Sequence, residues 1–235
     1  MARVVVPGVP HHVTQRGDRR ENVFLARGDY QRYLNLLKEY ATPRGLEVVA
    51  YCLMPNHVHL VAIPHRADSL SVVLKPVHLR LAQYVNWTHG MIGRRWQGRF
   101  FSCPLDERHT ATAVRYVELN PVRAGLVREA ESYQWSSAAA HAGLRDDDIL
   151  TADAHELVGA GDWRAWLRQT DDDESIQQLR LNTRTGRPFG DEPFVRKAER
   201  LTGRLLRPRP AGRPKVKQQQ SRNLDSVPRI MGELV

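Results

Sequence analysis

The segment 46–63 constrains the fold of this 235-residue chain more than any other. It consists of two runs rich in β-branched and aliphatic residues, 46–54 and 57–63, which are separated only by Pro55 and Asn56. A two-residue polar turn between such runs is typical of a β-hairpin. The sequence therefore predicts a pair of antiparallel strands here, around which the remaining elements must be arranged.

The segments on either side of this hairpin predict an alternation of strands and helices. A short strand is expected before it, at 9–15, and extended segments after it, within 96–105. Apolar residues recur at helical spacing in three further segments, namely 28–43, 69–88 with a kink or break at Pro76, and 110–120 with Thr110 as its cap. The order β-α-β-β-α-β-α indicates an α+β fold, a ferredoxin-like antiparallel sheet with helices on one face.

The net charge of +9 is distributed unevenly along the chain. Residues 1–128 have a net charge of +9, residues 129–179 of −9 and residues 180–235 of +9. A chain this basic is expected to bind a polyanion, and nucleic acid is the first candidate. A charged surface that only keeps the protein in solution is the alternative.

Composition and charge divide the chain into three parts. We expect a main domain over residues 1–145, an acidic helical connector with a small helical extension over 146–206, and a basic tail over 207–235. Apolar spacings predict helices near 153–169 and 194–206 within the second part. The tail is rich in Arg, Pro, Gly, Lys and Gln and cannot build an apolar core, so we expect it to be disordered when free.

The cysteines and the amino-terminal residues indicate where such a protein resides. Cys52 and Cys103 are too few and too far apart for a disulfide framework or a CxxC metal site, so buried free thiols are expected. The chain has no apolar run of 18 residues, and Pro7 interrupts the first valines before they could form an apolar leader. We therefore expect a soluble, cytoplasmic protein.

The second strand of the hairpin carries the first candidate site, because it begins His57-Val58-His59-Leu60. Side chains alternate between the faces of a strand, so His57 and His59 should point the same way. Two imidazoles on one face can bind a divalent cation. The alternatives are two solvated surface histidines, or a zinc site that includes the nearby Cys52.

A second candidate lies near the end of the helix expected at 110–120. Tyr116 and Asn120 are four residues apart and would share one helical face. If that face lies opposite the two histidines, a phenol oxygen and an amide oxygen reach the same cation. Glu118 should face away from this site. An ordinary core or interface tyrosine is the alternative for Tyr116.

The two stretches together resemble a known family. PNHVHL at 55–60, followed by RYVELNPVRAGLV at 115–127, is similar to the HUH-type single-tyrosine transposases. The chain looks most like the branch called REP-associated tyrosine transposases (RAYTs). The segments 7–17, 95–100 and 212–215 also fit that branch. The resemblance implies the HUH single-tyrosine transposase fold, with residues 1–145 as its catalytic domain.

The resemblance also implies a reaction, metal-dependent cleavage and rejoining of single-stranded, hairpin-forming DNA. Tyr116 would be the nucleophile, forming a 5′-phosphotyrosine and a free 3′-OH. His57, His59 and Asn120 would bind Mg²⁺ or Mn²⁺, although many relatives have glutamine where Asn120 stands. A monomer is expected rather than a dimer. The alternatives are a catalytically silent hairpin-DNA-binding regulator, a replication-type HUH nuclease and an RNA-binding ferredoxin-like module.

Basic residues on both sides of these motifs are candidates for DNA contacts, since guanidinium groups bind phosphates in bidentate fashion. They are Arg16, Arg19, Arg20, Arg94, Arg95, Arg99, Arg115 and Arg123. Trp96 would either stack on an unpaired base or belong to the core. In the tail, Arg213 and Lys215 fit a minor-groove hook or a non-specific phosphate tether.

Overall fold

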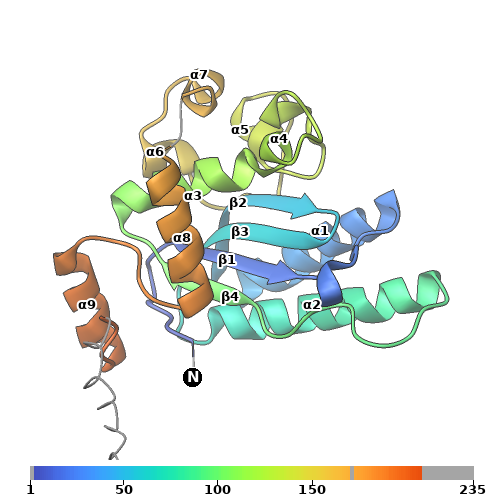
Figure 1. The fold of residues 1–235 in the computed structure, drawn as a ribbon, viewed down its shortest axis with the longest axis horizontal. Coiled ribbons are helices and arrows are strands. Elements are labelled where there is room, and N and C mark those ends of the chain that lie inside the picture. Colours follow the sequence, from blue (N-terminus) through green and yellow to red (C-terminus); the bar gives the residue numbers. More distant parts are fainter. Residues whose placement is uncertain (1–2, 170–171, 208–235) are drawn as a thin grey trace, which may run out of the picture.

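The structure, a computed structural model, describes residues 3–169 and 172–207 (Figure 1). Its centre is a four-stranded antiparallel sheet with the strand order β2-β3-β1-β4. The strands are β1 (His11–Arg16), β2 (Leu46–Met54), β3 (His57–Pro64) and β4 (Phe101–Pro104). The predicted hairpin is confirmed, because β2 and β3 pair from Met54 opposite His57 to Leu46 opposite Pro64. The α+β fold with an antiparallel sheet is thereby confirmed as well.

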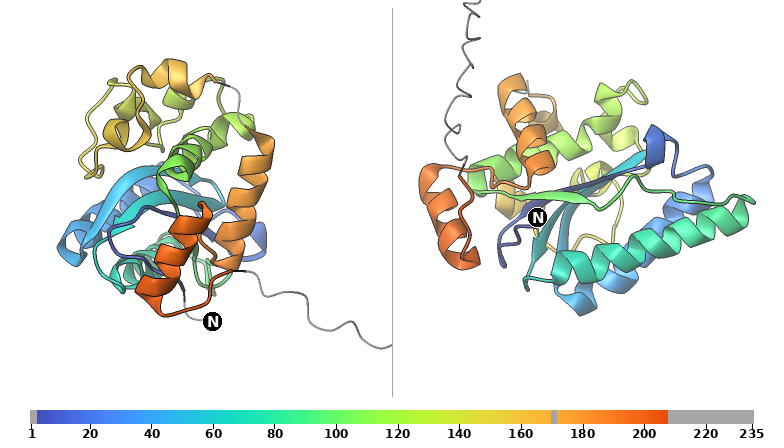
Figure 2. Two further views of the ribbon diagram at one scale, coloured as in Figure 1. Left: turned by 90° about the vertical axis from the view of Figure 1, so that its left-hand side faces the viewer. Right: turned by 60° about the horizontal axis from the view of Figure 1, so that its bottom comes forward.

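Helices cover both faces of this sheet (Figure 2). The helices α1 (Arg27–Ala41) and α2 (Ser69–Thr88) pack on one face, and α3 (Glu107–Glu118) and α8 (Asp173–Thr185) pack on the other. The expectation of helices on one face only is wrong. β2 is buried at every position except Glu47, and a strand with apolar side chains on both faces needs a layer of helices on each side.

The remaining helices are short. They are α4 (Asn120–Arg123), α5 (Ala138–His141), α6 (Ala154–Val158), α7 (Trp163–Leu167) and α9 (Glu192–Thr202), with single 3₁₀ turns η1 (Asp18–Arg20), η2 (Thr42–Arg44) and η3 (Ala130–Ser132). The single helix predicted over 153–169 is wrong. Gly159, with a φ of +67°, ends α6, and the Asp162 side chain begins α7 by accepting from the backbone N–H of Ala165. The helix predicted at 194–206 is α9.

The helix that carries Tyr116 has other boundaries than the sequence predicts. It begins before Thr110, because the Asp106 side chain accepts from the backbone N–H of His109 at 2.8 Å. It ends before Asn120, which begins the separate turn α4. Tyr116 and Asn120 are therefore on consecutive helical segments rather than on one.

The predicted break at Pro76 is absent, and α2 runs through this residue as one helix of 20 residues. Its buried residues Leu70, Val73, Val77 and Leu81 hold it against the sheet, which compensates for the hydrogen bond that a proline inside a helix removes. Neither α2 nor another helix in the described part of the chain is long and apolar enough to cross a membrane.

Residues after 145 pack on the same face of the sheet as α3. Ile176 and Leu179 of α8, together with Phe189, belong to one apolar cluster with Val61 of β3 and Cys103 of β4. This packing brings polar side chains of α8 close to the sheet as well. The boundaries of the three parts predicted from composition stay a prediction.

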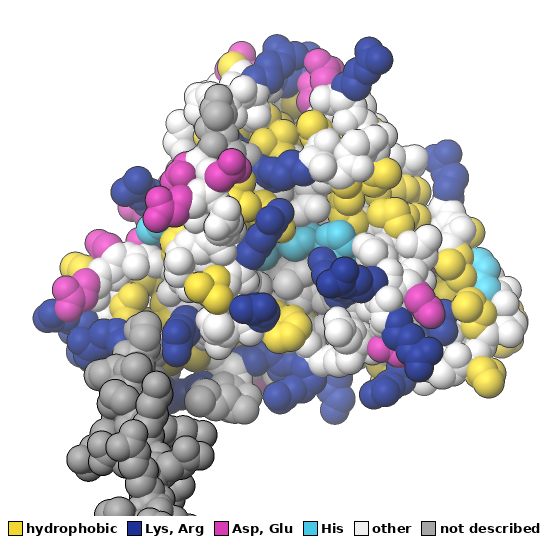
Figure 3. All heavy atoms as spheres, viewed as in Figure 1, with side chains coloured by type: hydrophobic (Ala, Val, Ile, Leu, Met, Phe, Trp, Pro, Cys, Tyr) yellow, Lys and Arg dark blue, Asp and Glu magenta, His cyan; other side chains and the backbone are white. Residues whose placement is uncertain are grey.

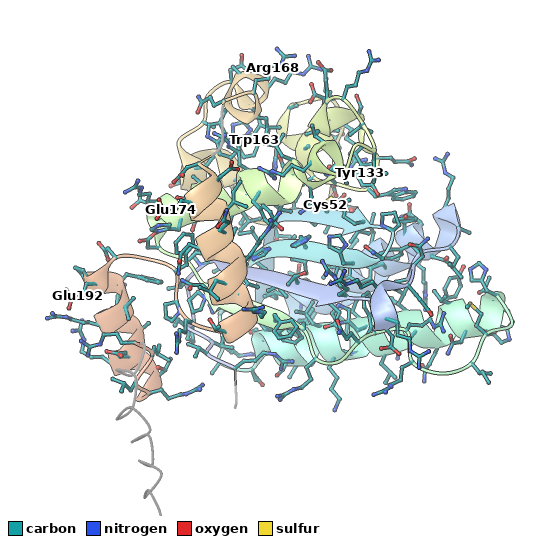
Figure 4. All side chains as sticks on the ribbon, viewed as in Figure 1. Cys52, Tyr133, Trp163, Arg168, Glu174 and Glu192 are labelled. Atoms are coloured by element: carbon teal, nitrogen blue, oxygen red, sulfur yellow. The ribbon has the colours of Figure 1, made fainter. Side chains whose placement is uncertain are left out.

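A buried carboxylate fixes α3 to the helices that follow it. Glu118 has no exposed surface, and its Oε1 lies 2.5 Å from Ser137 Oγ and 2.6 Å from His141 Nδ1. Its Oε2 accepts from Trp163 Nε1 at 2.7 Å (Trp163 is labelled in Figure 4). All of these contacts are with core residues, so the Glu118 side chain faces away from Tyr116, as predicted.

Replacing Glu118 with glutamine should therefore destabilise the fold. A glutamine amide would turn an NH₂ group toward a donor and leave buried groups unsatisfied, at a cost of about 2–3 kcal/mol in the free energy of unfolding. Urea unfolding followed by circular dichroism measures this difference. The matched control is Glu107→Gln on the exposed first turn of α3, which should change the free energy by less than about 0.5 kcal/mol. Equal stability of the two variants would contradict this account of Glu118.

Candidate active site

The two histidines of β3 lie on the sheet face that α3 covers. His57 and His59 point to the same side as predicted, and their ring centroids are 4.9 Å apart with an interplanar angle of 84°. His59 is buried, whereas His57, the first residue of β3, is half-buried. In Figure 3, histidine atoms are visible in the middle of this face with Lys and Arg side chains around them. The pair thus forms the floor of a site bordered by positive charge.

Tyr116 on α3 reaches this pair. Its ring centroid lies 5.4 Å from that of His59, at an interplanar angle of 89°. The buried residues Ala113, Val114 and Val117 fix the rotation of α3 on the sheet, which turns Tyr116 toward the histidines. The predicted convergence of the phenol and the histidines from separate elements is confirmed.

Asn120 completes the group from the start of α4. A hydrogen bond to its side chain raises the pKa of His57, although burial outweighs this effect. The amide therefore lies beside His57 even though α3 ends before it. The break after Glu118 thus leaves Asn120 within reach of the histidine pair.

Both histidines are held in their neutral form. Burial, with the charge of Arg16 as a smaller cause, lowers the pKa of His57 to about 4. Burial also lowers the pKa of His59 well below its usual value, and the positive charges of its neighbours add to this effect. At pH 7 both side chains therefore have a lone pair with which a metal ion can be bound.

A chain of hydrogen bonds behind His59 orients its ring. His59 Nδ1 lies 2.9 Å from His12 Nε2 on β1, and His12 Nδ1 lies 2.7 Å from Thr183 Oγ1 on α8. The Thr183 hydroxyl donates its proton to the Leu179 carbonyl oxygen at 2.7 Å, so it accepts from His12. His12 Nε2 is then the acceptor for the Nδ1–H of His59. This order of donors leaves the Nε2 lone pair of His59 for a ligand.

Two arginines contact the phenol. Arg180 Nε on α8 donates to Tyr116 Oη at 3.2 Å, and the guanidinium carbon lies 5.2 Å from the ring centroid. Arg123 on α4 lies at the same distance from the ring and donates to the Tyr116 carbonyl oxygen at 3.0 Å. Arg180 thus places a hydrogen-bond donor and a positive charge at the phenol oxygen, and Arg123 places a second positive charge beside the ring.

The residues that the sequence analysis missed come from distant segments. His12 stands in the opening stretch that supports the resemblance, but an isolated buried histidine gives no sign of its partner 47 residues later. Arg180 and Thr183 are i, i+3 on α8 and so share a face, a signal that becomes readable only when the position of α8 is known.

The donor set fits a divalent cation. Among residues 3–169 and 172–207, no group of three or more His, Cys, Asp or Glu side chains is arranged to hold a metal ion. Any third protein ligand among the described residues would therefore be of another type, and the Asn120 side chain, which is hydrogen-bonded to His57, lies beside the pair. His57 Nδ1 lies 2.6 Å from Asn56 Oδ1, which leaves Nε2 for a cation, as in His59. Such a set suits Mg²⁺ or Mn²⁺, which fill their other positions with water and phosphate oxygens.

The alternative zinc site is not favoured. Cys52 lies opposite His59 in the pairing of β2 with β3, and Figure 4 marks its position on the sheet. Its thiol is fully buried, and burial raises the pKa of Cys52 well above the usual value. Zinc needs the thiolate, which this environment disfavours.

The first group of candidate DNA contacts lies next to His57. Arg16 is paired with His57 across the sheet, and Arg19 and Arg20 follow it on η1, all with exposed side chains. Arg19 and Arg20 have φ values of +49° and +66°, which non-glycine residues rarely adopt. Asn56 stabilises this turn by donating to the Arg20 carbonyl oxygen at 3.1 Å. Strained backbone held in this way is common where side chains are positioned for function.

The second group of candidate DNA contacts contains both exposed and buried side chains. Arg94 and Arg99 are exposed, and Arg95 is half-buried. Trp96, however, is 8% exposed, belongs to the core and donates from Nε1 to the His78 carbonyl oxygen at 2.9 Å. Its predicted alternative role in the core is therefore confirmed, and stacking on an unpaired base has no exposed ring to support it.

Two further candidates are occupied by contacts within the protein. Arg115 is largely buried and donates to the Gln169 carbonyl oxygen at 2.5 Å, so its position supports packing rather than DNA contact. Arg123 contacts Tyr116 as described above. Arg213 and Lys215 lie outside the described residues.

Residues 6–120 match the family described as "Transposase IS200 like". A structure of a REP-associated tyrosine transposase bound to a REP hairpin is 20% identical, with 66% of this chain and 94% of that chain covered and a TM-score of 0.49. A Deinococcus radiodurans R1 structure described as a transposase is 23% identical, with 50% and 95% covered and a TM-score of 0.36. No curated protein matches the chain.

Proposed function

The chain belongs, through residues 6–120, to the IS200-like transposase family, and from this premise we propose that it cleaves and rejoins single-stranded DNA with Tyr116 as the nucleophile. The resemblance of the sequence to the REP-associated branch adds that the substrate forms hairpins. The observation that carries the proposal is the Tyr116 ring 5.4 Å from the His59 ring, with Asn120 beside His57.

The reaction proposed is a transesterification. The Tyr116 phenol oxygen attacks the phosphorus of one phosphodiester, the bond from phosphorus to the 3′ oxygen breaks, and the 3′ oxygen takes up a proton as the phenol loses one. The products are a 5′-phosphotyrosine and a free 3′-OH. One phosphoester replaces another, so a new 3′-OH can reverse the step and join a different strand without ATP.

The side chains around Tyr116 would favour this step. Arg180 donates to the phenol oxygen and, with Arg123, stabilises the phenolate as the proton leaves. An ordinary phenol has a pKa near 10 and is a weak nucleophile at pH 7. A guanidinium group cannot accept the proton, so the two arginines would act only by stabilising negative charge on the phenol oxygen. Glu118 is bound in the core and is not placed to accept it, so the proton would pass to solvent.

The metal ion would be held by His57, His59 and Asn120. When bound, a divalent cation polarises the phosphate and neutralises charge that develops in the transition state. His12 and Thr183 keep Nε2 of His59 free for this purpose through the hydrogen bonds described above.

Replacing Thr183, the last residue of the hydrogen-bond chain behind His59, should weaken metal binding. Thr183→Val keeps the shape of the side chain but removes the acceptor for His12, so the ring of His59 loses its fixed orientation. Partners of this kind are worth about 10- to 100-fold in metal affinity. Isothermal titration with Mn²⁺ in the absence of DNA measures the effect. Thr202→Val, which removes a similar hydroxyl on α9, is the control, and equal affinities in the two variants would refute the role of Thr183.

One experiment tests the proposed function. The protein is incubated with Mg²⁺ and single-stranded DNA containing a hairpin, and covalent adducts are sought after denaturation. We expect an adduct that is absent with a chelator and absent from a matched RNA. Hairpin binding without an adduct would favour the regulator instead, and preference for the RNA would favour an RNA-binding module; either result would overturn the proposal.

A further inference from the structure

An arginine-lined cavity lies apart from the two histidines of β3. It has a volume of about 690 Å³ and is formed by the amino-terminal segment, β4, the end of α8 and the segment after α9. Within residues 3–169 and 172–207, six arginines line it, namely Arg3, Arg99, Arg184, Arg187, Arg204 and Arg207. In Figure 3, Lys and Arg side chains are visible on this side of the molecule, between α8 and α9.

Part of the positive charge of this cavity is uncompensated within the described chain. No Asp or Glu is among the described residues that line it. Arg207 forms an ion pair with Glu199 at 3.0 Å, but Arg99, Arg184 and Arg187 have no ion pair with any described residue. Guanidinium groups gathered in a concave surface repel one another, and the arrangement is stable when an anion lies between them.

Two of the cavity arginines are held in place by contacts within the protein. Arg3 Nε donates to the Phe100 carbonyl oxygen at 2.9 Å, with its guanidinium 3.6 Å from the centroid of the Phe100 ring. Arg204 donates to the Arg3 carbonyl oxygen at 3.1 Å. The amino-terminal segment and the segment after α9 are thus bound together, and this reduces the entropy that would be lost when an anion binds.

The cavity is connected to the tyrosine site in two ways. Along α8, Arg180 contacts Tyr116, Thr183 contacts His12, and the next residue, Arg184, lines the cavity. Across the sheet, Thr14 of β1 is paired with His59 on one side and with Phe101 on the other. Paired residues of neighbouring strands point to the same face.

Phe101 therefore continues the row of side chains from His59 to the cavity. It is 47% exposed at the cavity wall, and an exposed ring is suited to contact with an unpaired base. A nucleic acid strand whose phosphate lies at Tyr116 can follow this row to reach the arginines. The planar guanidinium group forms bidentate hydrogen bonds with phosphate oxygens.

We propose that the cavity binds consecutive backbone phosphates of the single-stranded DNA that flanks the cleaved bond. The proposal rests on the proposed function, because it names where the flanking strand lies when a phosphate is at Tyr116. It assigns Arg184 and Arg187 to DNA binding, in addition to Arg99, and Phe101 to contact with a base.

The test is the double variant Arg184→Gln/Arg187→Gln. Both side chains are exposed, so the fold should be unaffected, which a thermal melt verifies. Binding of single-stranded DNA is measured by fluorescence anisotropy in EDTA, where no cleavage occurs, over a series of salt concentrations. We expect at least a 10-fold loss of affinity and a salt slope smaller by about 1.4, since each phosphate contact on a single strand contributes about 0.7. The control Arg128→Gln/Arg200→Gln removes the same charge from exposed positions outside the cavity and should change affinity less than 2-fold.

A second measurement locates the bound segment. The DNA is shortened first on one side of the cleavage site and then on the other. One of the two truncations should make the cavity variant and the unchanged protein bind equally well, because it removes the phosphates that the cavity contacts. Affinity and salt slope equal to those of the control, or a loss that neither truncation cancels, would overturn the proposal. Because the binding assay needs no cleavage, unchanged DNA affinity in the cavity variant would not alter the result of the covalent-adduct experiment. A missing adduct would likewise not alter the binding measurement.

Discussion

Tyr116→Phe is expected to abolish covalent adduct formation and strand cleavage while DNA binding is retained. The substitution removes only the hydroxyl that accepts from Arg180, and the ring continues to pack beside His59. Loss of a nucleophile commonly reduces turnover by on the order of 10⁴-fold or more. Denaturing gels with labelled DNA measure the adduct, and anisotropy measures binding.

The appropriate control is Tyr84→Phe on α2, a partly buried tyrosine that packs against the other core cluster. This variant should form the adduct at the rate of the unchanged protein. An adduct that persists in Tyr116→Phe would mean that another residue is the nucleophile, and the site described here would then lose its chemical role.

His59→Ala is expected to have the second largest effect. It removes one metal ligand and leaves His12 without its partner, so both Mn²⁺ affinity and cleavage should fall. A bound cation is worth several kcal/mol of transition-state stabilisation, which corresponds to a rate loss of roughly 1000-fold. Titration with Mn²⁺ and single-turnover cleavage at saturating DNA measure the two losses separately.

The control for this variant is His65→Ala, which changes an exposed histidine just beyond β3 that contacts Glu47. Its metal affinity and cleavage should remain within 2-fold of the unchanged protein. If His59→Ala loses cleavage but binds Mn²⁺ with unchanged affinity, His59 is not a metal ligand, and its place beside Tyr116 requires another explanation.

Local patterns were enough to predict the hairpin and the residues that converge on it. The alternation of side chains along β3 places His57 and His59 on one face of the sheet, independently of how the rest of the chain packs. The four-residue spacing predicted that Tyr116 and Asn120 both lie near the histidines, and they do, although the helix between them is interrupted. The resemblance to a family supplied the roles, which neither motif could have given alone.

The parts that sequence could not predict depend on contacts between distant segments. Apolar periodicity does not say which face of the sheet α8 covers, so Arg180 and Thr183 could not be placed beside Tyr116 and His12. The same limit applies to Trp96, whose burial depends on packing that brings it against His78. Charge counts indicated a polyanion but not the cavity, because its arginines come from segments far apart in the sequence, from Arg3 through Arg99 to Arg207.

The proposed site depends on His57, His59 and Asn120 holding one cation beside Tyr116. Crystals of the protein soaked with Mn²⁺ and measured by anomalous diffraction test it most directly. We expect one strong anomalous peak within about 2.5 Å of Nε2 of His57 and of His59, on the side of Tyr116 and Asn120. A peak elsewhere, or none at Mn²⁺ concentrations that support cleavage, would contradict the account.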